Sequence, residues 1–138
     1  MRRSVLPIFL ASVLLTAACS TPSTPTIPTN PGNPTTETFS ATINVNGAMT
    51  HPFTVGFAGT VTATLTSVSP DSTIPIGMSI GTWDGTTCSL GSGLFQDKAV
   101  QGSVITAAIS APGALCLRMY DSGSLTGPTT YSVDVVHP

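Results

Sequence analysis

Short segments in which apolar and polar residues alternate, separated by turn sequences, make up most of the chain from residue 39 onward. In one of them Val61, Ala63 and Leu65 alternate with threonines. A period of two is typical of a β-strand that buries one face. No segment keeps a helical period over about three turns. We therefore predict an all-β domain over residues 39–138, a β-sandwich or jelly roll of about seven or eight antiparallel strands.

Turn residues at two places predict β-hairpins. Asn46-Gly47 follows the first alternating segment, and both residues tolerate a positive φ. A second hairpin is expected to close the domain, because Gly, Ser and Pro residues separate the alternating segments Leu115–Met119 and Tyr131–Val135. Asp84-Gly85 is a further turn that directs the chain toward Cys88. The Gly-rich segment from Leu90 to Gln101 is expected to be a loop with at most a short strand.

The first 18 residues have the features of a secretory signal. Arg2-Arg3 precede the apolar run from Val5 to Leu15, which is too short to span a bilayer. The segment from Leu15 to Cys19 resembles the lipobox of bacterial lipoproteins, with Thr16 in place of the usual leucine. The resemblance implies that Cys19 is diacylated and becomes the new N-terminus. Ordinary signal cleavage, which would leave Cys19 as a free thiol, is the alternative.

The cysteine count favours lipidation of Cys19. Three cysteines in an oxidising compartment leave one without a partner, and acylation accounts for it. Two or more acyl chains make a stable membrane anchor. Ser20 follows the cysteine, which in Gram-negative lipoproteins points to the outer membrane. We therefore expect the protein to lie in the bacterial cell envelope, attached to a membrane through Cys19.

Proline recurs at every third position from Pro22 to Pro34, among Thr, Ser, Asn and Gly. A polyproline II helix has three residues per turn, so this spacing favours an extended rod. Residues 19–38 are therefore predicted to be a tether between the membrane and the domain. Recognition by a proline-binding module, or O-glycosylation of the threonines, is the alternative interpretation.

Charge and motifs exclude several functions. Beyond the signal segment, Lys98 and Arg118 are the basic residues, against six acidic ones, so no basic patch exists to bind nucleic acid. His51 and His137 belong to no recognisable catalytic or metal-binding motif. We expect a protein that is not an enzyme and that uses no cofactor and no metal, with a small hydrolase as the remote alternative.

Cys88 and Cys116 are expected to form a structural disulfide, since neither has a histidine or a second close cysteine beside it in the sequence. If Leu115, Leu117 and Met119 point inward, strand alternation directs Cys116, Arg118 and Tyr120 outward. The same alternation directs Trp83 outward. The disulfide would then gather five residues on one outer surface, a candidate ligand surface that consists of Trp83, Asp84, Arg118, Tyr120 and Asp121.

Two interpretations of this surface remain open. Two amphipathic aromatic rings with an arginine and carboxylates suit the binding of a sugar or a peptide. Alternatively, Trp83 covers the disulfide and Arg118 pairs with a neighbouring aspartate, which is a structural role only.

Several segments together resemble the bacterial pre-peptidase C-terminal domain: Val45-Asn46-Gly47, Phe53-Thr54-Val55, Gly59–Leu65, Ala111–Arg118 and Tyr131-Ser132-Val133. That family is a small non-catalytic jelly-roll sandwich appended to secreted peptidases and surface proteins. The resemblance implies a non-catalytic sandwich here. Ile74–Met78 stands where the family commonly has an Asp-containing strand, so no calcium role is carried over.

These observations lead to two expected functions for a lipid-anchored envelope module. The first is a structural role or the binding of an envelope protein through a sheet face or a sheet edge. The alternative is the binding of carbohydrate through Trp83 and Tyr120.

Overall fold

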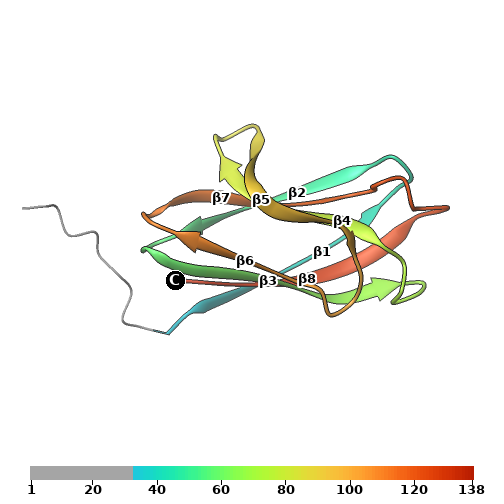
Figure 1. Cartoon of the computed structure of the whole chain (residues 1–138), viewed down its shortest axis with the longest axis horizontal. Coiled ribbons are helices and arrows are strands. Elements are labelled where there is room, and N and C mark those ends of the chain that lie inside the picture. The colour runs from blue at the N-terminus through green and yellow to red at the C-terminus, as the bar shows by residue number, and fades with distance from the viewer. Residues whose placement is uncertain (1–32) are drawn as a thin grey trace, which may run out of the picture.

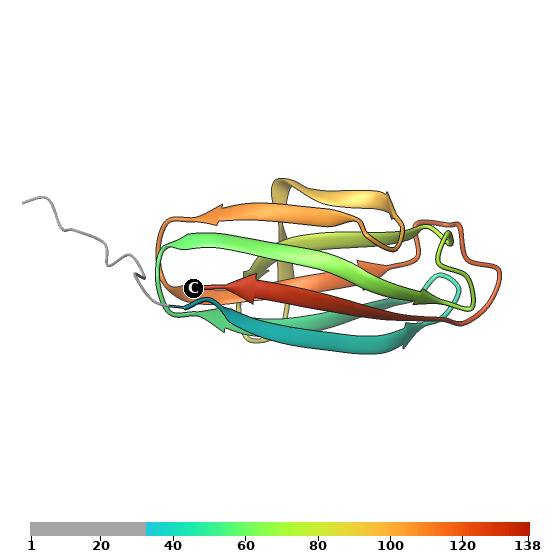
Figure 2. The same ribbon diagram turned by 90° about the horizontal axis from the view of Figure 1, so that it is seen from below.

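Strands at far ends of the chain lie side by side in two stacked β-sheets, as the computed structural model of residues 33–138 shows (Figure 1, Figure 2). Cys19, the expected signal and most of the expected tether lie outside the described residues. The eight strands of the described part are β1 (Thr35–Ile43), β2 (Ala48–Val55), β3 (Gly59–Ser69), β4 (Ile76–Trp83), β5 (Cys88–Ala99), β6 (Val104–Ile109), β7 (Gly113–Tyr120) and β8 (Thr129–His137).

The order of the strands is that of a jelly roll. One sheet has the order β1-β8-β3-β6 and the other β2-β7-β4-β5, and every pairing is antiparallel. All successive strands of the described chain lie in opposite sheets, except β4 and β5. The predicted all-β sandwich or jelly roll is therefore confirmed. Residues 33–138 contain no helix long and apolar enough to cross a membrane.

The two predicted hairpins are wrong. Asn46 has a φ of 59° and the Gly47 amide donates to the Asn44 carbonyl at 2.8 Å, so the turn exists. However, β1 pairs with β8 and β2 pairs with β7, so this turn carries the chain from one sheet to the other. The connection between β7 and β8 also crosses between the sheets. Alternation identifies the buried face of each strand but does not distinguish a neighbour in the same sheet from one across the core.

The hairpin that does form joins β4 to β5. The Asp84 amide donates to the Thr87 carbonyl at 3.3 Å, and Gly85 takes a φ of 101°, as the Asp-Gly turn predicts. The expectation of a loop from Leu90 to Gln101 is wrong, because β5 covers most of that segment. Between Leu90 and Phe95 the pairing with β4 is interrupted, so the glycines there belong to a bulge in a strand.

The first strand begins at Thr35 rather than at Phe39, so the last residues of the expected tether belong to the sandwich. Thr35 pairs with His137 in the register of β1 and β8. Within this added stretch the Glu37 carboxylate lies 2.9 Å from Nε2 of His137, and the Thr38 hydroxyl donates to Asp134 at 2.7 Å. These contacts attach the start of the domain to β8.

The core lies between the two sheets and is built from the alternate residues that face inward. Leu115, Leu117 and Met119 of β7 are buried, which confirms the inward row predicted for that strand. In β6, whose register the sequence leaves open, Ile105 and Ala107 face inward. The other strands contribute Ile43, Phe53, Val55, Val61, Ala63, Leu65, Ile76, Met78, Ile80, Tyr131, Val133 and Val135.

Candidate ligand-binding groove

A disulfide joins Cys88 to Cys116, as predicted, with an S–S distance of 2.03 Å. Cys116 pairs with Gly81 across β7 and β4, and lies on the face of that sheet opposite the core. A Cβ on Gly81 would lie 2.2 Å from the Ser89 carbonyl oxygen, so the first residues of β5 lie directly against the β4 backbone. The disulfide thus holds the start of β5 over the outer face of β4, where the yellow segment stands out in Figure 1.

The outer face of β4 is lined by the small residues Gly77, Ser79 and Gly81. A Cβ on Gly77 would lie 2.2 Å from the ring of Tyr120, so that ring occupies the space above the glycine. Ser79 is completely buried, and its hydroxyl donates to the Arg118 carbonyl at 3.4 Å. Small residues at every second position of β4 were the sequence signal for this covered face, and the sequence reasoning missed it.

Tyr120 is held in place by partners on two sides. Its hydroxyl donates to Asp97 of β5 at 2.5 Å. Burial, followed by this hydrogen bond and the charge of Asp97, raises the pKa of Tyr120 to about 12, so the phenol keeps its proton. The guanidinium carbon of Arg118 lies 5.7 Å from the centre of the Tyr120 ring, within the range of a cation–π contact.

Beside Arg118 a groove of about 340 Å³ opens on this outer face. Its lining comes from β2, from the end of β4, the turn after it and the start of β5, and from β7. The lining residues are Ala48, Thr50, Trp83, Thr86, Thr87, Cys88 and Arg118. Trp83 and Arg118 are both partly exposed. The structure therefore brings Trp83, Arg118 and the disulfide together, with Tyr120 next to Arg118.

Asp84 is engaged in the turn between β4 and β5. Its Oδ1 accepts hydrogen bonds from the amides of Thr86 and Thr87, at 2.8 and 2.6 Å. These bonds, that of Thr87 foremost, lower the pKa of the Asp84 carboxyl. Asp84 therefore stabilises the loop that carries Thr86 and Thr87, which line the groove.

Asp121 is engaged in a similar way between β7 and β8. Its Oδ2 accepts from the Asn46 amide at 2.8 Å, and its Oδ1 accepts from the amides of Gly123, Ser124 and Leu125. The bond from Asn46 is the largest cause of the lowered pKa of Asp121. This carboxylate joins the turn after β1 to the loop after β7, and it contributes no lining to the groove.

Arg118 forms no ion pair within residues 33–138, where the pair of His137 with Glu37 is the one present. The expectation that Arg118 pairs with a neighbouring aspartate is therefore wrong. The nearby carboxylates have other partners. Those of Asp84 and Asp121 accept hydrogen bonds from backbone amides, and that of Asp97 accepts one from the Tyr120 hydroxyl. Arg118 lines the groove, and its guanidinium forms no ion pair with any described side chain.

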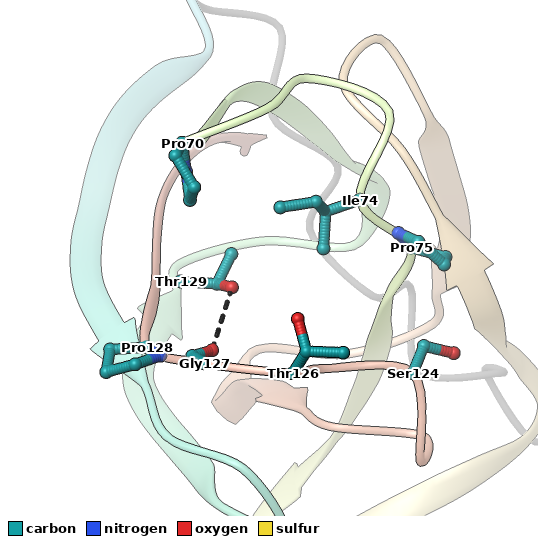
Figure 3. A pocket seen from close by; sticks show the side chains of 8 residues that line it. All are labelled: Pro70, Ile74, Pro75, Ser124, Thr126, Gly127, Pro128 and Thr129. Carbon is teal, nitrogen blue, oxygen red and sulfur yellow. Dashed lines mark hydrogen bonds between the residues drawn. The ribbon is translucent and has the colours of Figure 1, made fainter.

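A smaller cavity of about 150 Å³ lies at one end of the sandwich, between the loop that follows β3 and the loop that precedes β8 (Figure 3). The Thr129 hydroxyl donates to the Gly127 carbonyl at 3.3 Å along one wall. The lining residues are Pro70, Ile74, Pro75, Ser124, Thr126, Gly127, Pro128 and Thr129. None of them carries a charge or an imidazole, so this cavity, unlike the groove, offers no charged side chain to a ligand.

Both histidines face the space between the two sheets. Nε2 of His51 and the Tyr131 hydroxyl are 2.5 Å apart, and the Phe39 ring stacks on His51 with centroids 5.0 Å apart. Burial lowers the pKa of His51 and raises that of Tyr131. In the described part of the chain no three His, Cys, Asp or Glu side chains gather as a metal site would require. The groove is therefore the candidate site.

Comparison with models of known protein families gives no match, and no curated protein has a similar sequence.

Proposed function

We propose that this protein is a non-catalytic binding module of the bacterial cell envelope, attached to a membrane through a lipidated Cys19. Its ligand is a saccharide, held in the groove beside Trp83. The observation that carries this proposal is the groove itself, because it combines a partly exposed indole, an unpaired guanidinium and three threonines in one concave surface.

The composition of the groove suits a sugar. An indole ring offers a flat apolar face to the C–H groups of a pyranose and a single N–H donor at its edge. Thr50 and Thr87 add hydroxyl groups that both donate and accept hydrogen bonds. A volume of about 340 Å³ lies near the lower end of the usual range for ligand sites, which suits a mono- or disaccharide unit.

The proposed location agrees with the sequence features that lie outside the described residues. The lipobox-like segment supports membrane attachment through Cys19, and the proline-rich residues support a tether. The segments that resemble the pre-peptidase C-terminal domain support a non-catalytic role, because that family is itself non-catalytic.

The chain contains one tryptophan, so the fluorescence of Trp83 reports on the groove directly. We expect a saturable change in emission when purified full-length protein is titrated with envelope saccharides. Trp83→Ala should abolish the binding heat in calorimetry. Phe57→Ala is the matched control, because Phe57 is an aromatic residue exposed by 39% outside the groove. Unchanged binding by Trp83→Ala would contradict the proposal.

A second candidate function, binding of an envelope protein, is favoured by a separate observation at the edge of the other sheet. β6 pairs with β3 alone, so its outer edge has no strand partner, although the Val104 carbonyl accepts a hydrogen bond from Nε2 of Gln96 at 2.9 Å. Val104 in this strand is exposed by 44%, and the sequence Val-Ile-Thr-Ala-Ala-Ile contains no charge and no proline. By contrast, β2 carries Pro52 and β5 carries a bulge with Lys98, and both features hinder strand addition.

A lysine on the edge strand tests this second candidate. Val104→Lys should remove envelope proteins that cross-link to the domain, because edge lysines oppose strand pairing. Val45→Lys is the matched control, since Val45 is exposed to nearly the same extent, 45%, outside the strands. Cross-linking that persists in Val104→Lys would remove strand addition from consideration.

A further inference from the structure

The groove carries one charge, that of Arg118, and the rest of its lining is uncharged. The surrounding domain is acidic, since Lys98 and Arg118 oppose six acidic residues. Two of those acids lie near the groove in the fold, but their carboxylates already accept hydrogen bonds: Asp84 from Thr86 and Thr87, and Asp97 from Tyr120. Arg118 is therefore the one charged side chain that lines the groove, and neither carboxylate forms an ion pair with it.

The position of Arg118 is fixed by its neighbours. It lies on β7, between Thr50 of β2 and Ser79 of β4 in the strand register. The Tyr120 ring supports its guanidinium, and Asp97 in turn holds the hydroxyl of that ring. A guanidinium held in this way is preorganised, so less side-chain entropy is lost when it binds a ligand.

A planar guanidinium matches an oxyanion better than it matches a neutral hydroxyl. Its parallel N–H groups donate to two oxygens of a carboxylate or a phosphate at once. We infer that the groove selects saccharides that carry an acidic group, with the sugar ring against Trp83 and the carboxylate or phosphate on Arg118. This inference rests on the saccharide binding proposed above and adds the charge of the ligand to it.

Calorimetry with matched pairs of sugars tests the selection. The neutral disaccharide of N-acetylglucosamine is compared with the disaccharide of N-acetylglucosamine and N-acetylmuramic acid, which adds a lactyl carboxylate. Glucose and glucose 6-phosphate form the second pair. We expect the acidic member of at least one pair to bind roughly tenfold more tightly or better. The pair with the larger ratio identifies carboxylate or phosphate as the preferred group.

The outcomes separate the inference from the proposed function. Equal affinity within both pairs, lost in Trp83→Ala, would overturn acidic selection and leave saccharide binding in place. No binding of any of the four probes would overturn both.

Substitution of Arg118 gives a second test of the selection for acidic saccharides. Arg118→Gln should weaken binding of the acidic probe by roughly 10- to 100-fold, and by a larger factor than it weakens binding of the neutral probe. Arg118→Lys should give an intermediate loss of affinity, because an ammonium keeps the charge but lacks the parallel N–H groups of the guanidinium. Lys98→Gln is the control: it removes the same charge from an exposed position outside the groove and should change nothing.

Salt dependence keeps the inference testable if Arg118→Gln does not fold. Raising the salt concentration from about 50 mM to about 500 mM should weaken binding of the acidic probe to the wild-type protein and spare the neutral one. Affinity for the acidic probe that does not respond to salt would contradict a contact with Arg118.

Discussion

The aromatic ring of Tyr120 fills the space above Gly77, where a Cβ would lie 2.2 Å from Cε2 of the ring. Gly77→Ala must therefore displace the ring or separate β4 from β7. We expect the free energy of unfolding to fall by about 1–3 kcal/mol in urea denaturation. Gly113→Ala is the control, because a Cβ there meets nothing within 4 Å. Equal stability of the two variants would show that the ring moves aside without cost.

The disulfide is expected to stabilise the domain and to hold the groove together. It closes a loop with a sequence separation of 28, which corresponds to about 3.5 kcal/mol in the chain-entropy model. Cys88→Ala/Cys116→Ala should lose about this much in urea denaturation. Reductant should destabilise the wild-type protein and leave the double variant unchanged. A wild-type protein that does not respond to reductant would contradict this role.

Stability should fall in mild acid because of His51. Burial lowers the pKa of this histidine from 6.5, so the unfolded chain takes up its proton at a higher pH than the folded protein. The stability that neutral His51 contributes is therefore present above 6.5 and is lost as the pH falls below that value. Phe39 and the Tyr131 hydroxyl contact the ring, and neither supplies a negative charge to offset the proton.

Urea denaturation at about pH 7.5 and about pH 5 measures this effect. His51→Gln should have a flatter profile, since an amide does not titrate. His137 is present in both proteins, so the difference between the two profiles reports on His51. Identical profiles would contradict the prediction.

Asp121, which directly follows β7, is expected to contribute more to stability than Asp134 within β8. It accepts backbone hydrogen bonds from Asn46 and from its own loop, whereas Asp134 accepts one from the Thr38 hydroxyl. Asp121→Ala should therefore lower the urea midpoint more than Asp134→Ala does. Because the pKa of Asp121 is lowered from 3.8, its contribution is present above that value and is lost as the pH falls through the folded pKa. Equal midpoints for the two variants would contradict this ranking.

The class of fold could be predicted because most strands bury one face only, and such strands stack as two sheets. The pairing of the strands could not. Asn46-Gly47 forms a tight turn whether the next strand continues in the same sheet or crosses to the other, and the alternation of β1 and β2 fits both arrangements. The Gly-rich part of β5 was missed because glycines in a bulge have the same composition as a loop.

Part of the candidate site could be predicted by the same reasoning. Alternation along β4 and β7 places Trp83 and Arg118 on the face that carries the disulfide, which the structure shows. The role of Asp84 could not be predicted from the sequence, because it depends on amides that the turn brings within hydrogen-bonding distance. The hydrogen-bond partner of Tyr120 could not be predicted either, because Asp97 belongs to β5, a strand that the sequence analysis expected to be a loop.

The position of β8 in the middle of its sheet has a consequence for the order of assembly. β8 is the last strand of the described chain, and it separates β1 from β3, so their sheet cannot be completed before β8 is available. Contacts between segments so distant in sequence make folding slow. A chain that emerges from its N-terminus onward therefore cannot complete this sheet until the last described strand appears.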